Sequence, residues 1–134
     1  MKKHIYILIS LVLILGVSAC TKGSIPSEEK ETYKSLAEDI IQKVQSYDFE
    51  SLEDISTDEL KKALTEETTN KIKEILAPKG AFQSFDKAKF TTRKDPHTQL
   101  EYILVQYKVK YEEDSVIYSL TFDKEKKLAG IFLK

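Results

Sequence analysis

The sequence predicts an α+β domain in which all helices precede all strands. Between residues 27 and 76, apolar side chains recur at the i, i+3, i+4, i+7 spacing of a helix face. Between residues 102 and 133 they alternate with polar side chains, which is the period of a strand. This order favours helices packed on one face of a curved antiparallel meander of about four strands.

Four helical segments are expected before residue 80. The first begins at Ser27, a candidate N-cap residue. Its apolar face consists of Tyr33, Leu36, Ala37, Ile40, Ile41, Val44 and Tyr47. A short segment starts at Asp48, and the next matches the capping-box pattern over residues 56–59. The last opens after Thr65 and ends at Pro78.

The strands are expected after residue 80. They cover about residues 82–90, 103–111, 116–122 and 128–133, with turns at 95–97, 112–115 and 123–127. Residues 100–107 are unusual because both faces of the strand are apolar: Tyr102 and Leu104 lie on one face, and Ile103 and Val105 on the other. A sheet with one solvated face alternates more strictly. We therefore expect the second face to be covered by a helix, a subunit or a partner.

The N-terminus resembles a bacterial lipoprotein signal peptide. Two lysines in residues 1–4 precede an apolar run over residues 5–17, and Val17-Ser18-Ala19-Cys20 matches a lipobox. The run is shorter than the ~20 residues that a membrane-spanning helix needs. We expect residues 1–19 to be removed and Cys20 to carry a diacylglyceryl group that holds the chain at the extracytoplasmic face of the cell membrane. The alternatives are an ordinary secretory signal with a chance cysteine and an uncleaved signal anchor.

The processed chain is expected to comprise the lipidated cysteine with a short linker, residues 20–27, and one domain, residues 28–134. Loss of Lys2 and Lys3 leaves 22 acidic residues against 19 of the original 21 basic ones, a net charge of −3. A mildly acidic domain has no electrostatic reason to bind nucleic acid. We expect no nucleic-acid partner.

Few residues in the processed chain can carry chemistry. Cys20 is the only cysteine, so lipidation leaves no thiol for a disulfide, a nucleophile or a metal site. His97 is then the only histidine and lies in a turn, whereas histidine metal sites usually need a second histidine or a cysteine. The acidic turn at residues 112–114 lacks the spacing of a calcium loop. We expect no catalytic residues, no metal and no cofactor, and therefore a protein that is not an enzyme.

Several short motifs occur in an order that resembles a known family. They lie at residues 48–50, 56–61, 80–82, 120–123 and 130–134. The chain is similar in these motifs to a family of bacterial extracytoplasmic domains of unknown function, whose members are often lipoproteins or are joined to a larger hydrolase. The resemblance implies a fold like that of nuclear transport factor two, a cystatin-like cone in which a bent sheet wraps around helices. It implies no activity, since fold alone does not determine function.

These observations lead to three functional hypotheses. The first is a lipid-anchored, non-catalytic domain that binds a small apolar or peptide ligand at the mouth of the cone, lined by Tyr47, Tyr107 and Tyr118. The simpler role for these tyrosines is packing in the core or at an edge. The second hypothesis is a protein–protein or homodimerisation module of the cell envelope. The weakest is an isomerase- or hydrolase-like enzyme that uses a pocket carboxylate with a tyrosine donor.

Overall fold

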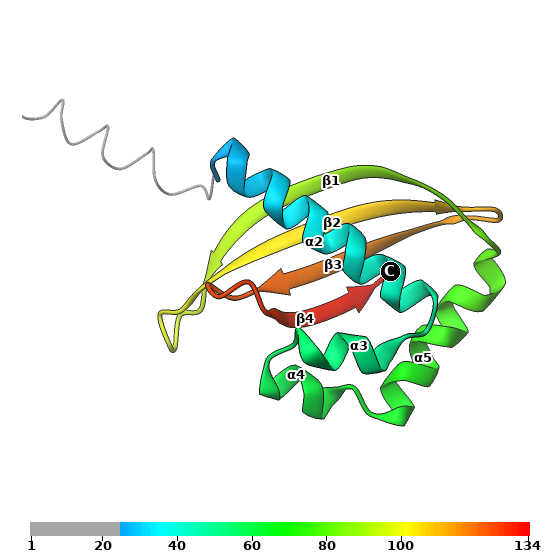
Figure 1. Ribbon diagram of the computed structural model, residues 1–134, viewed down its shortest axis with the longest axis horizontal. Helices are drawn as coiled ribbons and strands as arrows, with labels where there is room; N and C mark the ends of the chain where they lie inside the picture. Colours follow the sequence, from blue (N-terminus) through cyan, green and yellow to red (C-terminus); the bar gives the residue numbers. More distant parts are fainter. Residues whose placement is uncertain (1–24) are drawn as a thin grey trace, which may run out of the picture.

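The computed structural model describes residues 25–134, and shows four α-helices, a short 3-10 helix and a four-stranded sheet (Figure 1). The elements are α2 (Ser27–Gln45), α3 (Phe49–Asp54), α4 (Asp58–Ala63), α5 (Glu66–Leu76), η1 (Ala77–Lys79), β1 (Phe82–Lys94), β2 (Glu101–Tyr111), β3 (Ser115–Phe122) and β4 (Leu128–Leu133). The predicted α+β order, with helices first and strands last, is confirmed. The predicted signal peptide and Cys20 lie outside the described residues.

The sheet is an antiparallel meander with strand order β1-β2-β3-β4. Val105 on β2 lies opposite Phe90 of β1 and Leu120 of β3, which fixes the register at the centre of the sheet. The pairing of β1 with β2 is irregular at two places, between Phe82 and Ser84 and between Phe85 and Ala88. Such bulges bend a strand and increase its twist, and β1 describes an arc in Figure 1.

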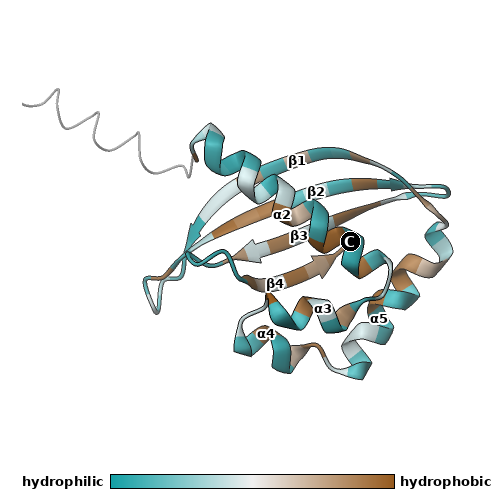
Figure 2. Ribbon diagram, in the orientation of Figure 1, coloured by the Kyte–Doolittle hydropathy of each residue, from teal (hydrophilic) through white to brown (hydrophobic). Residues whose placement is uncertain are grey.

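One face of the sheet is dry because alternate strand residues pack against the helices. On β2 these residues are Val105, Tyr107, Val109 and Tyr111. They share one core with residues of α2, α3, α4 and α5, so the helices cover this inner face. Figure 2 shows hydrophobic stretches along β2, β3 and β4 where α2 crosses the sheet. The helix and strand periodicities in the sequence therefore describe the two sides of one interface.

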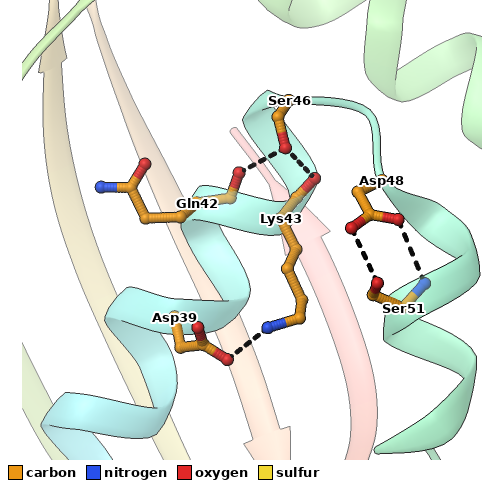
Figure 3. Close-up of polar contacts among 6 residues, drawn as sticks. All are labelled: Asp39, Gln42, Lys43, Ser46, Asp48 and Ser51. Carbon is orange, nitrogen blue, oxygen red and sulfur yellow. Dashed lines mark hydrogen bonds and ion pairs between the residues drawn. The ribbon is translucent and has the colours of Figure 1, made fainter.

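The end of α2 is fixed by a Schellman motif of backbone hydrogen bonds. Figure 3 shows the side-chain contacts beside it. Tyr47 has a positive φ of 60°, and the N–H groups of Tyr47 and Asp48 donate to the carbonyls of Val44 and Lys43. The Ser46 hydroxyl donates to the Lys43 carbonyl as well, at 3.1 Å. Asp48 then caps α3 by accepting from the backbone N–H of Ser51. Hydrogen bonds from Ser51 hold the pKa of the Asp48 carboxyl below its usual value.

Two predicted helix starts are shifted by one residue. Pro26, rather than Ser27, precedes α2, and no side chain caps that end. Residues 56–59 do not form the expected capping box, because Thr57 is the N-cap of α4 and accepts from the N–H of Leu60. Ser56 is buried instead, and its hydroxyl donates to the carbonyl of Leu52 at 2.6 Å. Pairing with β4 accounts for the shift, because residues 55–57 form a parallel bridge with Leu128 that places Ser56 in the core and leaves Thr57 to cap α4.

The helical and sheet halves are joined at Gly80, whose φ of 86° and ψ of −160° belong to a region that only glycine adopts readily. A Cβ at this position would lie 2.9 Å from Glu112 Cβ and 2.9 Å from its Oε1. Glu112 cannot easily move away, because its Oε1 accepts the N–H of Ala81 at 2.8 Å.

We therefore predict that Gly80→Ala lowers the free energy of unfolding by about 1–3 kcal/mol. Urea or guanidinium unfolding followed by circular dichroism measures this loss. Gly130→Ala is the matched control, because a Cβ there would meet Thr121 at an ordinary 3.5 Å. Equal losses in the two variants would contradict the role of the Gly80 conformation.

Candidate binding cleft

A cleft opens at one end of the sheet, between the root of the β1–β2 hairpin and the β3–β4 turn. Two adjoining cavities of about 510 and about 300 Å³ form it. They adjoin each other, because both are lined by Glu101, Tyr102, Asp123 and Lys124. We call this feature the end cleft. Neither cavity is enclosed, so a ligand there would remain partly exposed to solvent.

Side chains from the helical half complete the two sides of the end cleft. On one side it reaches Glu59 of α4 and Leu100, whose side chain is 52% exposed. On the other side it reaches Glu29 and Tyr33 of α2. Tyr33 packs its ring against Phe122 at a centroid distance of 5.4 Å, which ties this wall of the cleft to the core.

Tight turns hold the sheet side of the end cleft in place. The Asp123 carboxylate accepts the backbone N–H groups of Glu125 and Lys127, each at 2.9 Å. Lys126 between them has a positive φ of 66°, the left-handed conformation that such a tight turn needs. Asp95 acts in the same way in the β1–β2 loop, where its carboxylate accepts the N–H of His97 at 2.7 Å. These two carboxylates therefore shape loops, as expected for aspartates at turns.

The end cleft is predominantly acidic. Five carboxylates line it, with two ammonium groups: Glu29, Glu59, Glu101, Asp123 and Glu125, and Lys124 and Lys126. Lys124 lies 3.9 Å from Glu101, and both side chains are well exposed, so this ion pair is weak. Burial raises the pKa of the Tyr33 phenol, and the charges of Glu29 and Asp123 raise it further. The phenol thus stays a neutral donor beside the carboxylates.

The three tyrosines predicted to line a pocket lie elsewhere and do not form one mouth. Tyr47 is 40% exposed at the end of α2, where its ring stacks on Phe49 and lies under the Lys73 ammonium. It lines a smaller cavity of about 280 Å³ together with Tyr111. Tyr107 and Tyr118 are buried in the core, with 2% and 0% of their surfaces exposed.

The buried tyrosines hold α2 to the sheet by hydrogen bonds. The Tyr107 hydroxyl donates to Glu38 of α2 at 2.5 Å. The Tyr111 hydroxyl donates to the Gln45 amide oxygen at 2.8 Å and lies 2.6 Å from the Tyr118 hydroxyl. Burial is the main cause that raises the pKa of each of the three phenols. Strand alternation could place these residues on the inner face but could not show that α2 would supply their partners.

The residues considered for catalysis are dispersed. His97 lies in the exposed β1–β2 loop, where its backbone N–H bonds to Asp95. Glu38 and Tyr107 form a carboxylate–tyrosine pair of the kind that the enzymatic hypothesis needs, but neither lines the end cleft. Among residues 25–134, no three His, Cys, Asp or Glu side chains are grouped as metal ligands. The expected absence of activity, metal and cofactor remains a prediction.

Residues 37–131 match the family described as "Protein of unknown function (DUF3887)". The chain belongs to this family. The match includes Glu59, residues 100–102 and residues 123–125 of the end cleft, whereas Glu29 and Tyr33 lie before it. No curated protein matches the chain.

A solved structure resembles this member of the DUF3887 family. It is the NMR structure of a protein from Ruminococcus gnavus ATCC 29149, with a TM-score of 0.73 and 32% sequence identity. The alignment covers 83% of this chain and 96% of that one. The solved protein is therefore folded in solution as a domain of about this extent. Neither match tests the resemblance to nuclear transport factor two, which remains a prediction. Within residues 25–134, no helix is long and apolar enough to cross a membrane.

The buried phenols predict how stability depends on pH. Their pKa values in the folded chain lie above the value near 10 that they take when unfolded. The stability that they contribute is therefore complete below pH ~10 and is lost as the pH rises, because the unfolded chain ionises first. We expect the free energy of unfolding to fall from about pH 9 to about pH 11. Urea titrations at several pH values measure it.

Tyr118→Phe isolates this contribution, since it removes a fully buried phenol while Tyr111 keeps its bond to Gln45. The fall in unfolding free energy with pH should be shallower in this variant. An equally steep fall would show that lysines or other groups, rather than the buried phenols, cause it.

Proposed function

We propose that this protein is a lipid-anchored extracytoplasmic domain that binds, without catalysis, a short peptide carrying cationic side chains in its end cleft. The observation that carries the proposal is the lining of that cleft, which combines five carboxylates with the apolar side chain of Leu100 and the ring of Tyr102. Carboxylates attract lysine and arginine side chains, and the apolar groups offer contact area for the carbon chains that bear them.

The openness of the end cleft favours a peptide over a small apolar molecule. Pockets for small apolar ligands bury most of the ligand surface. The two cavities of the end cleft are open to solvent and adjoin each other, which suits an extended chain. This site replaces the pocket of Tyr47, Tyr107 and Tyr118 in the hypothesis, because burial removes two of those three residues from a ligand's reach.

The lipid anchor is supported by the sequence alone. A lysine-bearing start, a short apolar run and Val17-Ser18-Ala19-Cys20 together have the order of a lipoprotein signal. Ile25 is 7% exposed and lies two residues before the start of α2 at Ser27. The five peptide units from Cys20 to Ile25 span at most about 20 Å. The end cleft, which begins at Glu29, would therefore be held close to the bilayer.

A first prediction tests the anchor through Cys20→Ala expressed from the full chain. Wild-type protein should stay with membranes through a wash in about 1 M salt, which screens surface charge, and should require detergent for release. The variant should be released by the wash or should keep its signal peptide. Lys22→Ala is the control and should behave as wild type. A variant that is processed and still needs detergent would overturn the lipobox interpretation.

A second prediction tests the end cleft with two synthetic peptides, Ala-Lys-Phe-Lys-Ala and Ala-Glu-Phe-Glu-Ala. In NMR titrations of residues 24–134, the lysine peptide should shift the amide signals of residues 100–102 and 123–125. The glutamate peptide should not, since the cleft repels it. No shift with either peptide, or equal shifts with both, would reject the cleft as a site for cationic peptides.

Charge reversal in the end cleft provides the matched variant. Glu59→Lys with Glu125→Lys should lower the affinity for the lysine peptide by about tenfold or more, because two attractive charges become repulsive. Glu50→Lys with Glu113→Lys makes the same changes in a helix first turn and a hairpin turn outside the cleft. This control should bind as wild type. If both pairs weaken binding equally, net charge rather than the cleft attracts the peptide.

A further inference from the structure

The face of the sheet opposite the helices remains uncovered within residues 25–134. We call it the outer face. Its side chains form three cross-strand rows: Thr91-Leu104-Thr121-Gly130, Lys89-Gln106-Ser119-Phe132 and Lys108-Ile117-Lys134. Phe132 is 63% exposed, Ile117 is 38% exposed and Leu104 is half-buried. Of the three expected covers for this second face, a helix, a subunit or a partner, the helix is excluded within the described residues, and the other two remain predictions.

The outer face is basic, in contrast to the helical half of the molecule. Six basic side chains lie on it or at its margin, with two acidic ones: Lys89, Arg93, Lys94, Lys108, Lys110 and Lys134, and Asp86 and Asp95. Asp86 lies 4.0 Å from Lys108, and Asp95 is engaged by its own loop. Residues 27–79, by comparison, hold fourteen acidic and eight basic side chains.

A groove of about 470 Å³ runs between the β1–β2 loop and the strands of the outer face. Its polar lining includes Arg93 and Lys94 from the end of β1, and Gln106, Ser119 and Thr121 from β2 and β3. Guanidinium, ammonium, amide and hydroxyl groups are the donors that hold a phosphate group. The Asp95 carboxylate also lines this groove but accepts two backbone N–H groups of its loop.

We propose that the outer face lies on an anionic lipid bilayer, with Phe132 and Ile117 in the interfacial region and the basic side chains among the headgroup phosphates. Exposed aromatic and aliphatic side chains surrounded by lysine and arginine are what such a surface attracts. A second copy fits less well, because two outer faces would bring like charges together. The acidic helical half would then face away from the membrane.

The proposed anchor makes weak docking sufficient, and in this respect the inference rests on the proposed function. A domain held within about 20 Å of the bilayer meets it at a high effective concentration, so a modest affinity, measurable for the free domain at low salt, is enough to set its orientation. The end cleft adjoins the outer-face groove at Tyr102, which lines both, while Glu29, Tyr33 and Glu59 of the cleft belong to the helical half.

Vesicle co-sedimentation of residues 24–134 tests the docking without the anchor. The probes are vesicles of phosphatidylcholine alone and vesicles with about 30 mol % phosphatidylglycerol. We expect binding to the anionic vesicles only, with an affinity that falls as salt is added. Absence of binding to the anionic vesicles at low salt, or equal binding to both, would overturn the proposal.

Matched charge reversals locate the bound face. Lys89→Glu with Lys110→Glu should weaken binding to anionic vesicles by about 25-fold or more, since each lysine near such a surface contributes on the order of fivefold. Lys34→Glu with Lys62→Glu changes the same number of charges on α2 and α4 and should have a much smaller effect. Equal losses in the two variants would show attraction by net charge and would overturn the assignment to the outer face.

A fluorescence probe reports on the apolar contact, because the chain contains no tryptophan. The emission of Phe132→Trp should shift to the blue with anionic vesicles, whereas that of Tyr47→Trp, on the helical side, should not. A blue shift of Phe132→Trp that follows protein concentration without lipid would mean that a second copy covers this face, and would overturn the proposal. Because residues 24–134 lack Cys20, these outcomes are independent of the Cys20→Ala experiment. They are distinct from the peptide experiment because they vary the lipid and the outer face, not the peptide and the end cleft.

Discussion

The packing of α2 across the inner face of the sheet is the contact on which the rest of this structure depends. It brings the fully buried side chains of Ile41 and Val44 against the central strands. It also brings polar atoms into the core, because Tyr107 and Tyr111 extend across it with their hydroxyls. A buried hydroxyl without a partner costs about 1–3 kcal/mol. Glu38 and Gln45 supply the partners from α2, so the position of this helix is set by hydrogen bonds as well as by apolar area.

The sequence predicts the layers of this fold well because both periodicities are regular. Val105, Tyr107, Val109 and Tyr111 alternate without a break, and the structure places all four on the inner face. Tyr47 shows the limit of the same reasoning. It continues the helical period of α2, yet the helix ends at Gln45 and Tyr47 takes a left-handed conformation outside it. Periodicity gives a side chain's face but says little about where an element stops.

The end cleft was harder to predict, for a physical reason. Its lining comes from the β1–β2 loop, the β3–β4 turn and the helices, which are far apart in the sequence. Asp123 and Asp95 are recognisable as turn residues, but nothing local shows that their loops border one cavity. The apolar residues on both faces of 100–107 were the one available signal. This pattern singled out two apolar side chains on the second face of the strand: Tyr102, which lines the cleft, and Leu104, which lies on the outer face.

The hydrogen bonds between α2 and the sheet also bear on how the chain folds. Glu38 and Tyr107 are 69 residues apart, and Gln45 and Tyr111 are 66 residues apart. During synthesis α2 therefore emerges long before β2 and β3 exist to cover it. Contacts of such separation close large loops and slow the folding of small domains. The apolar face of α2 must remain without its partner until almost the whole domain has been made, and a nascent chain in this state is a natural substrate for chaperones.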